Sequence, residues 1–251
     1  MIEQTELRNA HGAGRFLLVC EHASNAFPEE FGDLGLDAAV REAHVAWDPG
    51  ALGVARRLSD LLDSPLVAAT VSRLVYDCNR PPDATGAMPP KSEVYDIFGN
   101  RDIRPEERLA RTESVYLPFH TAVSQQLARM LALGQRPVFV TVHSFTPVWF
   151  GQKRDVQFGI IHDTDPHYAE AVVAAARDLP LNVALNEPYS AADGVVHTLR
   201  LHATPHDLAH AMLEIRNDLL GDTAAQEAMA GDIAVVLERA LAAHDEDGRA
   251  A

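Results

Sequence analysis

The sequence has few cysteines, no long apolar run and no excess of positive charge. Its two cysteines, Cys20 and Cys78, are too few for a disulfide framework, which excludes the small disulfide-stabilised secreted domains. No apolar run approaches the ~20 residues that a membrane-spanning helix requires. The first fifteen residues do not combine a basic segment with an apolar one, so we expect no signal peptide and a cytoplasmic protein.

Negative charge dominates the chain, whose formal net charge is −15 at pH 7. This charge repels phosphate backbones and anionic membrane surfaces, and no lysine and arginine cluster with interleaved aromatic residues offsets it. We therefore expect neither a nucleic acid nor a membrane as partner. An anionic small molecule would need a few local arginines to hold it against the overall field.

Alternating strand-like and helix-like segments predict an α/β fold. The 251 residues are enough to bury a full core, and we expect a single domain over 1–251. The alternation is typical of a three-layer α/β/α architecture with a mixed, mostly parallel sheet. The expected strands cover residues 15–20, 65–71, 137–142, 156–162, 181–185 and 211–216, and the expected helices cover residues 48–63, 105–133, 166–178 and 222–243.

Three further features interrupt or connect these elements. Pro118 is expected to bend or divide the helix over 105–133. Residues 83–103 are rich in Pro, Gly, Asp and Asn and predict a long surface loop, a feature typical of binding or lid elements. Residues 186–206 read as a loop with room for one more strand.

Two histidines lie where apolar, β-rich runs end. His22 follows the run over 15–20, and His143 follows the run over 137–142. Side chains at strand ends in an α/β sheet converge on the crevice where such folds place their ligands. Each histidine could be an ordinary polar residue at a strand end, but their similar local settings favour a shared role. Neutral imidazole is a common zinc ligand, so we predict that both bind a metal.

Asp48 is the candidate for an acidic third ligand. It stands at the start of the helix over 48–63, where it could serve only as the helix N-cap. That helix must pack near the end of the first strand, so the carboxylate could instead point at His22. Glu21 is the alternative ligand. Two imidazoles and one carboxylate would suit a divalent metal, expected to be zinc, although other divalent ions accept the same ligands.

Glu214 lies inside an apolar strand. Alternation places Met212, Glu214 and Arg216 on one face and Leu213 and Ile215 on the other. A carboxylate in such a strand is costly unless it is paired or used, so Glu214 forms either an ion pair with Arg216 or the general base of a hydrolytic reaction. Burial would raise its pKa toward the working range of a base.

The segment 72–81 leaves a strand carrying two arginines. The planar guanidinium group suits bidentate binding of a carboxylate, so Arg73 or Arg80 is the predicted substrate anchor. We also expect one of the two to form a structural ion pair with Asp77. Arg216 is a further candidate for holding a substrate carboxylate or a developing oxyanion. His120, His197 and Tyr189 are further candidates for contacts around the site.

Taken together, these residues resemble the N-formylglutamate amidohydrolase family, and their layout is similar to that of the wider zinc-exopeptidase and phosphorylase/hydrolase-like folds. The chain lacks the nucleophile elbow, Walker-type loop and His-Glu-x-x-His motif of other enzyme classes. The matching pieces span about 200 residues. They are EHASN at 21–25, HVAWDPGA at 44–51, SRLVYDCNRP at 72–81, YLPFH at 116–120, HSFTP at 143–147 and LEIR at 213–216.

The resemblance implies a metal held by His22, Asp48 and His143, with Glu214 as the catalytic residue. It also implies that Asn79 and Arg80 resemble the substrate-binding Asn-Arg pair of aspartoacylase-like relatives, which binds acidic substrates. The expected activity is hydrolysis of the formyl or acyl amide of a small anionic N-acylamino acid such as N-formylglutamate.

The chain departs from one family motif. Members that act in histidine degradation carry a Pro-His-Ser-Gly type motif where this chain has Glu-His-Ala-Ser at 21–24. The chain therefore resembles a divergent branch, in which the amide-hydrolase chemistry is better supported than the substrate. Two alternatives stay open: a zinc peptidase or murein-type amidase acting on larger substrates, and a non-catalytic relative that binds a metal or ligand.

Overall fold

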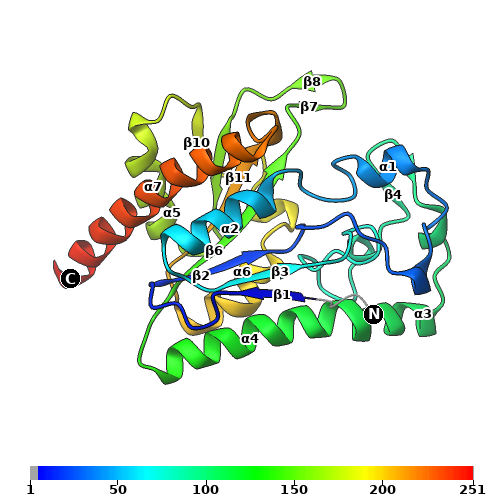
Figure 1. Cartoon of the computed structure of the whole chain (residues 1–251), viewed down its shortest axis with the longest axis horizontal. Coiled ribbons are helices and arrows are strands. Elements are labelled where there is room, and N and C mark those ends of the chain that lie inside the picture. Colours follow the sequence, from blue (N-terminus) through cyan, green and yellow to red (C-terminus); the bar gives the residue numbers. More distant parts are fainter. Residues whose placement is uncertain (1–4, 251) are drawn as a thin grey trace.

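The computed structural model describes residues 5–250, and within this range seven strands form one mixed sheet (Figure 1). The strands are β1 (Thr5–Arg8), β2 (Phe16–Cys20), β3 (Leu66–Ala69), β6 (Val138–Phe145), β9 (Phe158–Ile161), β10 (Val183–Leu185) and β11 (His210–Arg216). Their order across the sheet is β1-β3-β2-β6-β11-β9-β10. The central strands β3, β2, β6 and β11 are parallel, whereas β1 and the β9–β10 pair run antiparallel to them.

Continuous burial explains the position of the central strands. Every residue of β2 and β6 is buried, so neither strand alternates between apolar and polar positions. Strands of this kind need cover on both faces, which is typical of parallel sheets flanked by helices. Because β2, β6 and β11 run parallel, their carboxyl ends lie at the same edge of the sheet.

Helices form a layer on each face of the sheet, as the sequence predicted (Figure 1). Leu18 and Cys20 of β2 pack with the face that carries α2, α5 and α7, whereas Leu17 and Val19 pack with the face that carries α4 and α6. No helix within residues 5–250 is long and apolar enough to cross a membrane. The helices are α1 (Ala38–Glu42), α2 (Ala51–Leu61), α3 (Pro105–Arg111), α4 (Leu117–Ala132), α5 (His167–Ala175), α6 (His197–His202) and α7 (Thr223–Ala250).

The helix expected over 105–133 is divided near Pro118, as predicted. A π-helical turn, Thr112–Tyr116, separates α3 from α4. Pro118 lies directly after this turn, in a helical run that continues from α3 to α4, so its missing backbone N–H interrupts the helical hydrogen-bond pattern at the π-helical turn.

Two small hairpins and several boundaries differ from the sequence-based expectation. The loop over 83–103 contains the hairpin β4 (Lys91–Ser92) and β5 (Tyr95–Asp96), and a second hairpin, β7 (Val148–Trp149) and β8 (Gln152–Lys153), projects beyond β6 (Figure 1). The further strand expected within 186–206 is wrong, since those residues form α6 and no strand. Strand β6 also continues past its expected end, so His143 lies inside the strand.

Candidate active site

The predicted ligands gather at the edge of the sheet where the central parallel strands end. His22 follows β2 by two residues, His143 lies in β6, and Glu214 of β11 pairs with His143 in the parallel register. Asp48 comes shortly before α2, and its backbone N–H donates to the carbonyl oxygen of His22 at 2.9 Å. Segments far apart in the sequence therefore deliver these four side chains to one place.

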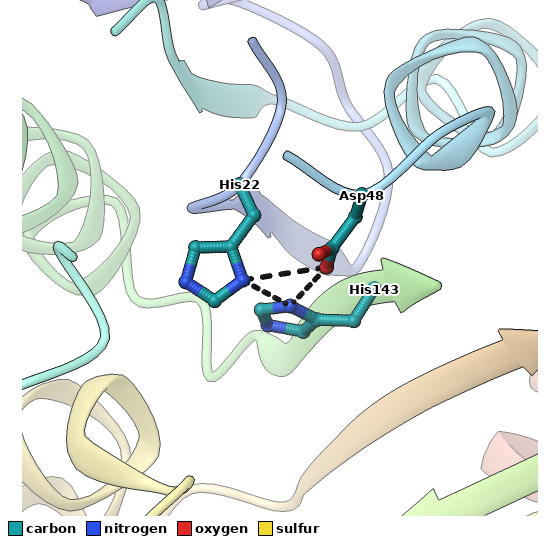
Figure 2. Close-up of side chains that lie close together, drawn as sticks. All are labelled: His22, Asp48 and His143. Carbon is teal, nitrogen blue, oxygen red and sulfur yellow. Dashed lines mark hydrogen bonds and ion pairs between the residues drawn. The ribbon is translucent and has the colours of Figure 1, made fainter. Parts of the chain in front are cut away.

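Three ligand-type atoms face one another in a buried triad of His22, Asp48 and His143 (Figure 2). Asp48 Oδ2 lies 2.9 Å from His143 Nδ1 and 3.3 Å from His22 Nδ1, and the two Nδ1 atoms are 3.2 Å apart. Tetrahedral ligands at about 2.0–2.2 Å from a zinc ion lie about 3.4 Å from one another, close to the size of this triangle. The triad could therefore hold a metal ion.

The far ring nitrogens of the two histidines each face a carboxylate. His22 Nε2–H donates to Asp77 Oδ1 at 2.7 Å, and Glu21 Oε2 lies 3.1 Å from His143 Nε2. The second contact has ion-pair distance but lacks the alignment of a hydrogen bond. Carboxylates in these positions favour a proton on Nε2, which leaves the Nδ1 lone pair for a metal. Glu21 thus lies behind His143, and the geometry favours Asp48 over Glu21 as the acidic ligand.

The expectation that Asp48 caps the helix over 48–63 is wrong. The N-cap of α2 is Gly50, which has a φ of 83°, and no side chain caps the helix. A Cβ atom at Gly50 would lie 2.4 Å from the side chain of Leu220, so both the backbone angle and the close approach favour glycine. Asp48 Oδ2 instead accepts a hydrogen bond of 3.3 Å from the backbone N–H of Ser144 in β6.

Carboxylates outnumber imidazoles when the partners of the triad, Glu21 and Asp77, are counted with it. Burial disfavours ionised Asp48, but the imidazoles of His22 and His143 outweigh burial and lower the pKa of the carboxyl group. Burial also disfavours a charged His143, yet Glu21 and Asp48 raise the pKa of this imidazole well above its ordinary value. The site therefore attracts positive charge, which protons on the imidazoles or a divalent cation could supply.

Glu214 is a buried carboxyl group without the ion pair that the sequence allowed. Its Oε2 has no hydrogen-bond partner among the described residues, and Arg216 instead donates from Nε to Asp218 at 2.8 Å. Burial raises the pKa of Glu214 to about 7, although the nearby His143 opposes the rise. The alternative of a Glu214–Arg216 pair is therefore wrong, and an unpaired carboxyl group that can exchange a proton near neutral pH lies beside the triad.

Arg73 and Arg80 both line a cavity of about 340 Å³ that includes the triad. Arg73 donates to Asp77 Oδ2 at 2.9 Å and also lies 3.4 Å from Asp48 Oδ1, so its charge is used within the site. Arg80 donates from Nη1 to the carbonyl oxygens of Asn79 and Gly194. The predicted ion pair between Asp77 and one of the two arginines is confirmed for Arg73.

Asn79 and Arg216 do not line this cavity. The Asn79 amide donates to the carbonyl oxygen of Val195, and its Oδ1 accepts from the Thr198 backbone N–H at 3.0 Å. These two bonds connect the segment that follows β3 to the start of α6. Arg216 is held by Asp218. The substrate-binding roles of Asn79 and Arg216 stay predictions.

The loop over 83–103 contributes to the lining of the cavity. Ser92 of this loop and His44 both line it, and Glu93 Oε2 lies 2.9 Å from His44 Nε2. Its role as a lid stays a prediction. Among the further candidates, Tyr189 also lines the cavity, whereas His120 and His197 do not.

Sequence reasoning missed several residues around the triad. Asp77 was considered only as an arginine partner, and Glu21 only as a competing ligand, although each faces a histidine ring nitrogen. The signal for Asp77 was a carboxylate inside an apolar stretch. Phe145 and Trp149, which line the cavity, were also missed. Phe145 stands two positions after His143, so strand alternation could have placed both on one face.

Comparison with known proteins agrees with this arrangement. A family profile described as N-formylglutamate amidohydrolase matches residues 14–220. The chain belongs to the N-formylglutamate amidohydrolase family. This membership supports an amidohydrolase, that is, a hydrolase acting on C–N bonds. A comparison with curated protein sequences found no significant match.

Two crystal structures are similar in fold to this chain. A gene product from Agrobacterium tumefaciens is 50% identical, with a TM-score of 0.94 over 96% of this chain and 95% of that chain. An N-formylglutamate amidohydrolase from Ralstonia eutropha is 18% identical, with a TM-score of 0.68 over 95% of this chain and 97% of that chain. The second likeness concerns the fold alone.

Proposed function

We propose that this protein is a metal-dependent amidohydrolase that removes the formyl or acyl group from a small N-acylamino acid. The observation that carries the proposal is the triangle of His22 Nδ1, Asp48 Oδ2 and His143 Nδ1 beside an unpaired, buried Glu214. Zinc is the proposed ion, because two imidazoles and a carboxylate form a common catalytic ligand set with one position left open.

A divalent cation held by the triad would polarise the acyl carbonyl and lower the pKa of a water molecule beside it. Glu214 is the proposed general base, since its buried Oε2 lacks a hydrogen-bond partner in residues 5–250 and its pKa is raised to about 7. It accepts the proton of the attacking water and returns a proton to the leaving nitrogen as the C–N bond breaks. The products are a carboxylic acid and a free amino acid.

Arg80 is the proposed anchor for the substrate carboxylate. Arg73 is occupied by Asp48 and Asp77, so it holds the acidic groups of the site in place. Arg80 lines the same cavity and bonds only to backbone carbonyl oxygens among its described partners. We propose a small anionic substrate, which Arg80 binds against the overall field, and a cytoplasmic protein. The net charge of −15 disfavours nucleic-acid and membrane partners.

The test is hydrolysis of N-formylglutamate, other N-acylamino acids and muropeptides by the purified protein, before and after chelation. We expect release of free amine from at least one small N-acylamino acid, loss of release after chelation, and recovery when zinc is returned. Turnover of muropeptides alone would favour the alternative of an amidase for larger substrates. Hydrolysis that survives complete metal removal would contradict the proposal.

A further inference from the structure

One side of the cavity is formed by an aromatic wall, which we define as Phe145, Trp149 and Tyr189. Phe145 is two residues beyond His143 in β6, so its side chain leaves the same face of the strand. Trp149 belongs to the β7–β8 hairpin, and Tyr189 comes from the segment after β10. The wall therefore joins three separate segments directly beside the triad.

Arg154 fixes the aromatic wall. Its guanidinium carbon lies 5.5 Å, 5.0 Å and 4.9 Å from the ring centroids of Phe145, Trp149 and Tyr189, and its Nη1 donates to the Tyr189 hydroxyl at 3.0 Å. Its own backbone is held in turn, because Arg216 Nη1 donates to the Arg154 carbonyl oxygen at 3.0 Å. Stacking and hydrogen bonding together hold the rings in place before any ligand arrives.

Among the cationic side chains that line the cavity, one is available for a substrate carboxylate; Arg154, which stacks on the aromatic wall, is not among the lining residues. Arg73 is bound to two carboxylates, and His44 is paired with Glu93. Arg80 forms no ion pair with a carboxylate of the part of the chain that the structure describes. N-formylglutamate carries two carboxylates, so one of them would bind Arg80 while the other would meet hydroxyl groups of the lining, such as Ser92 and Thr146, but no second unpaired cation. Desolvation of a carboxylate without an opposite charge is unfavourable.

We propose that the preferred substrates are N-acylamino acids with a single carboxylate and an apolar, preferably aromatic, side chain that packs against the aromatic wall. Arg80 binds the carboxylate, and the amide lies toward the triad and Glu214. Val45 and Val195 add apolar surface to the same cavity. This inference rests on the proposed amidohydrolase function and names the substrate class of that site.

The test compares kcat/KM for N-formylphenylalanine, N-formylleucine and N-formylglutamate in the zinc-loaded protein. We expect the wild type to favour N-formylphenylalanine over N-formylglutamate by at least about tenfold, since contacts in an apolar pocket discriminate on the order of 10–200-fold. In Trp149→Ala this ratio should fall at least about tenfold, mainly through KM of the aromatic substrate. Trp149→Phe, which keeps a ring, should restore much of it.

Phe98→Ala is the matched control, because Phe98 is an exposed aromatic residue that does not line the cavity. Its substrate ratio should match that of the wild type. A wild-type preference for N-formylglutamate, or an unchanged ratio in Trp149→Ala, would overturn this inference while the amidohydrolase function stands. Absence of hydrolysis for every N-acylamino acid would overturn both.

Discussion

At the scale of single residues, the carboxylates behind the histidines matter as much as the triad itself. Asp77 fixes the His22 ring by accepting from Nε2–H, and Glu21 lies at the corresponding nitrogen of His143. These contacts explain why both Nδ1 atoms face Asp48 instead of turning toward water. Metal-binding histidines generally depend on partners of this kind for their tautomer and orientation.

Replacing Asp77 by Asn should therefore weaken metal binding without removing a ligand. The Asn amide can donate to His22 Nε2, which moves the ring proton to Nδ1 and blocks the ligand atom. We expect zinc affinity, measured by competition with a chelating dye, to fall by about 10–100-fold. Asp163→Asn is the matched control, since Asp163 is also buried and paired with an arginine, Arg200, away from the triad. Equal affinities in both variants would contradict the role of Asp77.

Glu214→Gln should separate catalysis from metal binding. The amide keeps the shape of the side chain but cannot accept a proton, so kcat should fall by ~10²–10⁴ while metal content stays that of the wild type. Steady-state kinetics and elemental analysis on the same preparation measure both quantities. Glu238→Gln, at an exposed position on α7, should leave both unchanged. Full activity in Glu214→Gln would reject Glu214 as the base.

The raised pKa of Glu214 also predicts a pH-dependent stability difference in the metal-free protein. Its pKa is raised from 4.5 to about 7 in the folded state, so the fold favours the protonated form. The contribution of protonated Glu214 to the free energy of unfolding is fully present below about pH 4.5. This contribution is lost as the pH rises through 7, where the folded protein releases the proton. Above pH 7, metal-free Glu214→Gln should exceed the wild type in free energy of unfolding, by up to about 3 kcal/mol. Urea titrations at pH 4.5 and pH 8 test this, and a difference independent of pH would contradict it.

At the scale of secondary-structure elements, the sequence predicted the sheet better than its connections. The apolar runs over 15–20, 137–142 and 211–216 became β2, β6 and β11, because buried parallel strands are specified by continuous apolar residues. The triad and Glu214 followed from this, since parallel strands end at one edge. The prediction of a strand within 186–206 was wrong because a residue far away in the sequence determines the conformation of this segment. Asn79 fixes the start of α6 there, and such a contact leaves no local pattern.

Other errors had the same origin in tertiary contacts. Asp48 and Pro49 form a standard helix-start signal, but Gly50 takes the cap and Asp48 turns to His22, His143 and the backbone of β6. Likewise, Arg216 pairs locally with Asp218, a choice that strand alternation could not reveal. Propensity therefore identified the elements, whereas the partners of individual polar side chains needed the folded arrangement.

Gly159 of β9 lies where the packing of the strand leaves no room for a side chain. It pairs with Glu214 in the antiparallel register, and a Cβ atom there would lie 1.9 Å from the carbonyl oxygen of Glu187. Gly159→Ala should therefore lower the free energy of unfolding by about 1–3 kcal/mol or more, as measured by urea denaturation. In contrast, Gly231→Ala in α7 meets no atom within 4 Å and should raise stability by about 0.5–1 kcal/mol. The same sign for both substitutions would contradict this account of Gly159.

At the scale of the whole molecule, the chain concentrates acidic groups where a cation is needed. Four buried carboxyl groups, Glu21, Asp48, Asp77 and Glu214, surround two imidazoles and the Arg73 guanidinium, in a protein whose net charge is already −15. Burial of so many acidic groups is costly unless positive charge compensates them. A divalent cation at the triad would supply that charge and help to attract an anionic substrate against the overall field.

The most direct test of this account is the metal content of the purified protein and of its Asp48→Ala and His143→Ala variants, measured by elemental analysis after gel filtration. We expect about one divalent ion per chain in the wild type and far less in both variants, with far-UV circular dichroism unchanged. A wild type that binds no divalent ion when zinc is supplied, or variants that keep the full amount, would contradict the claim that these three residues form a metal site.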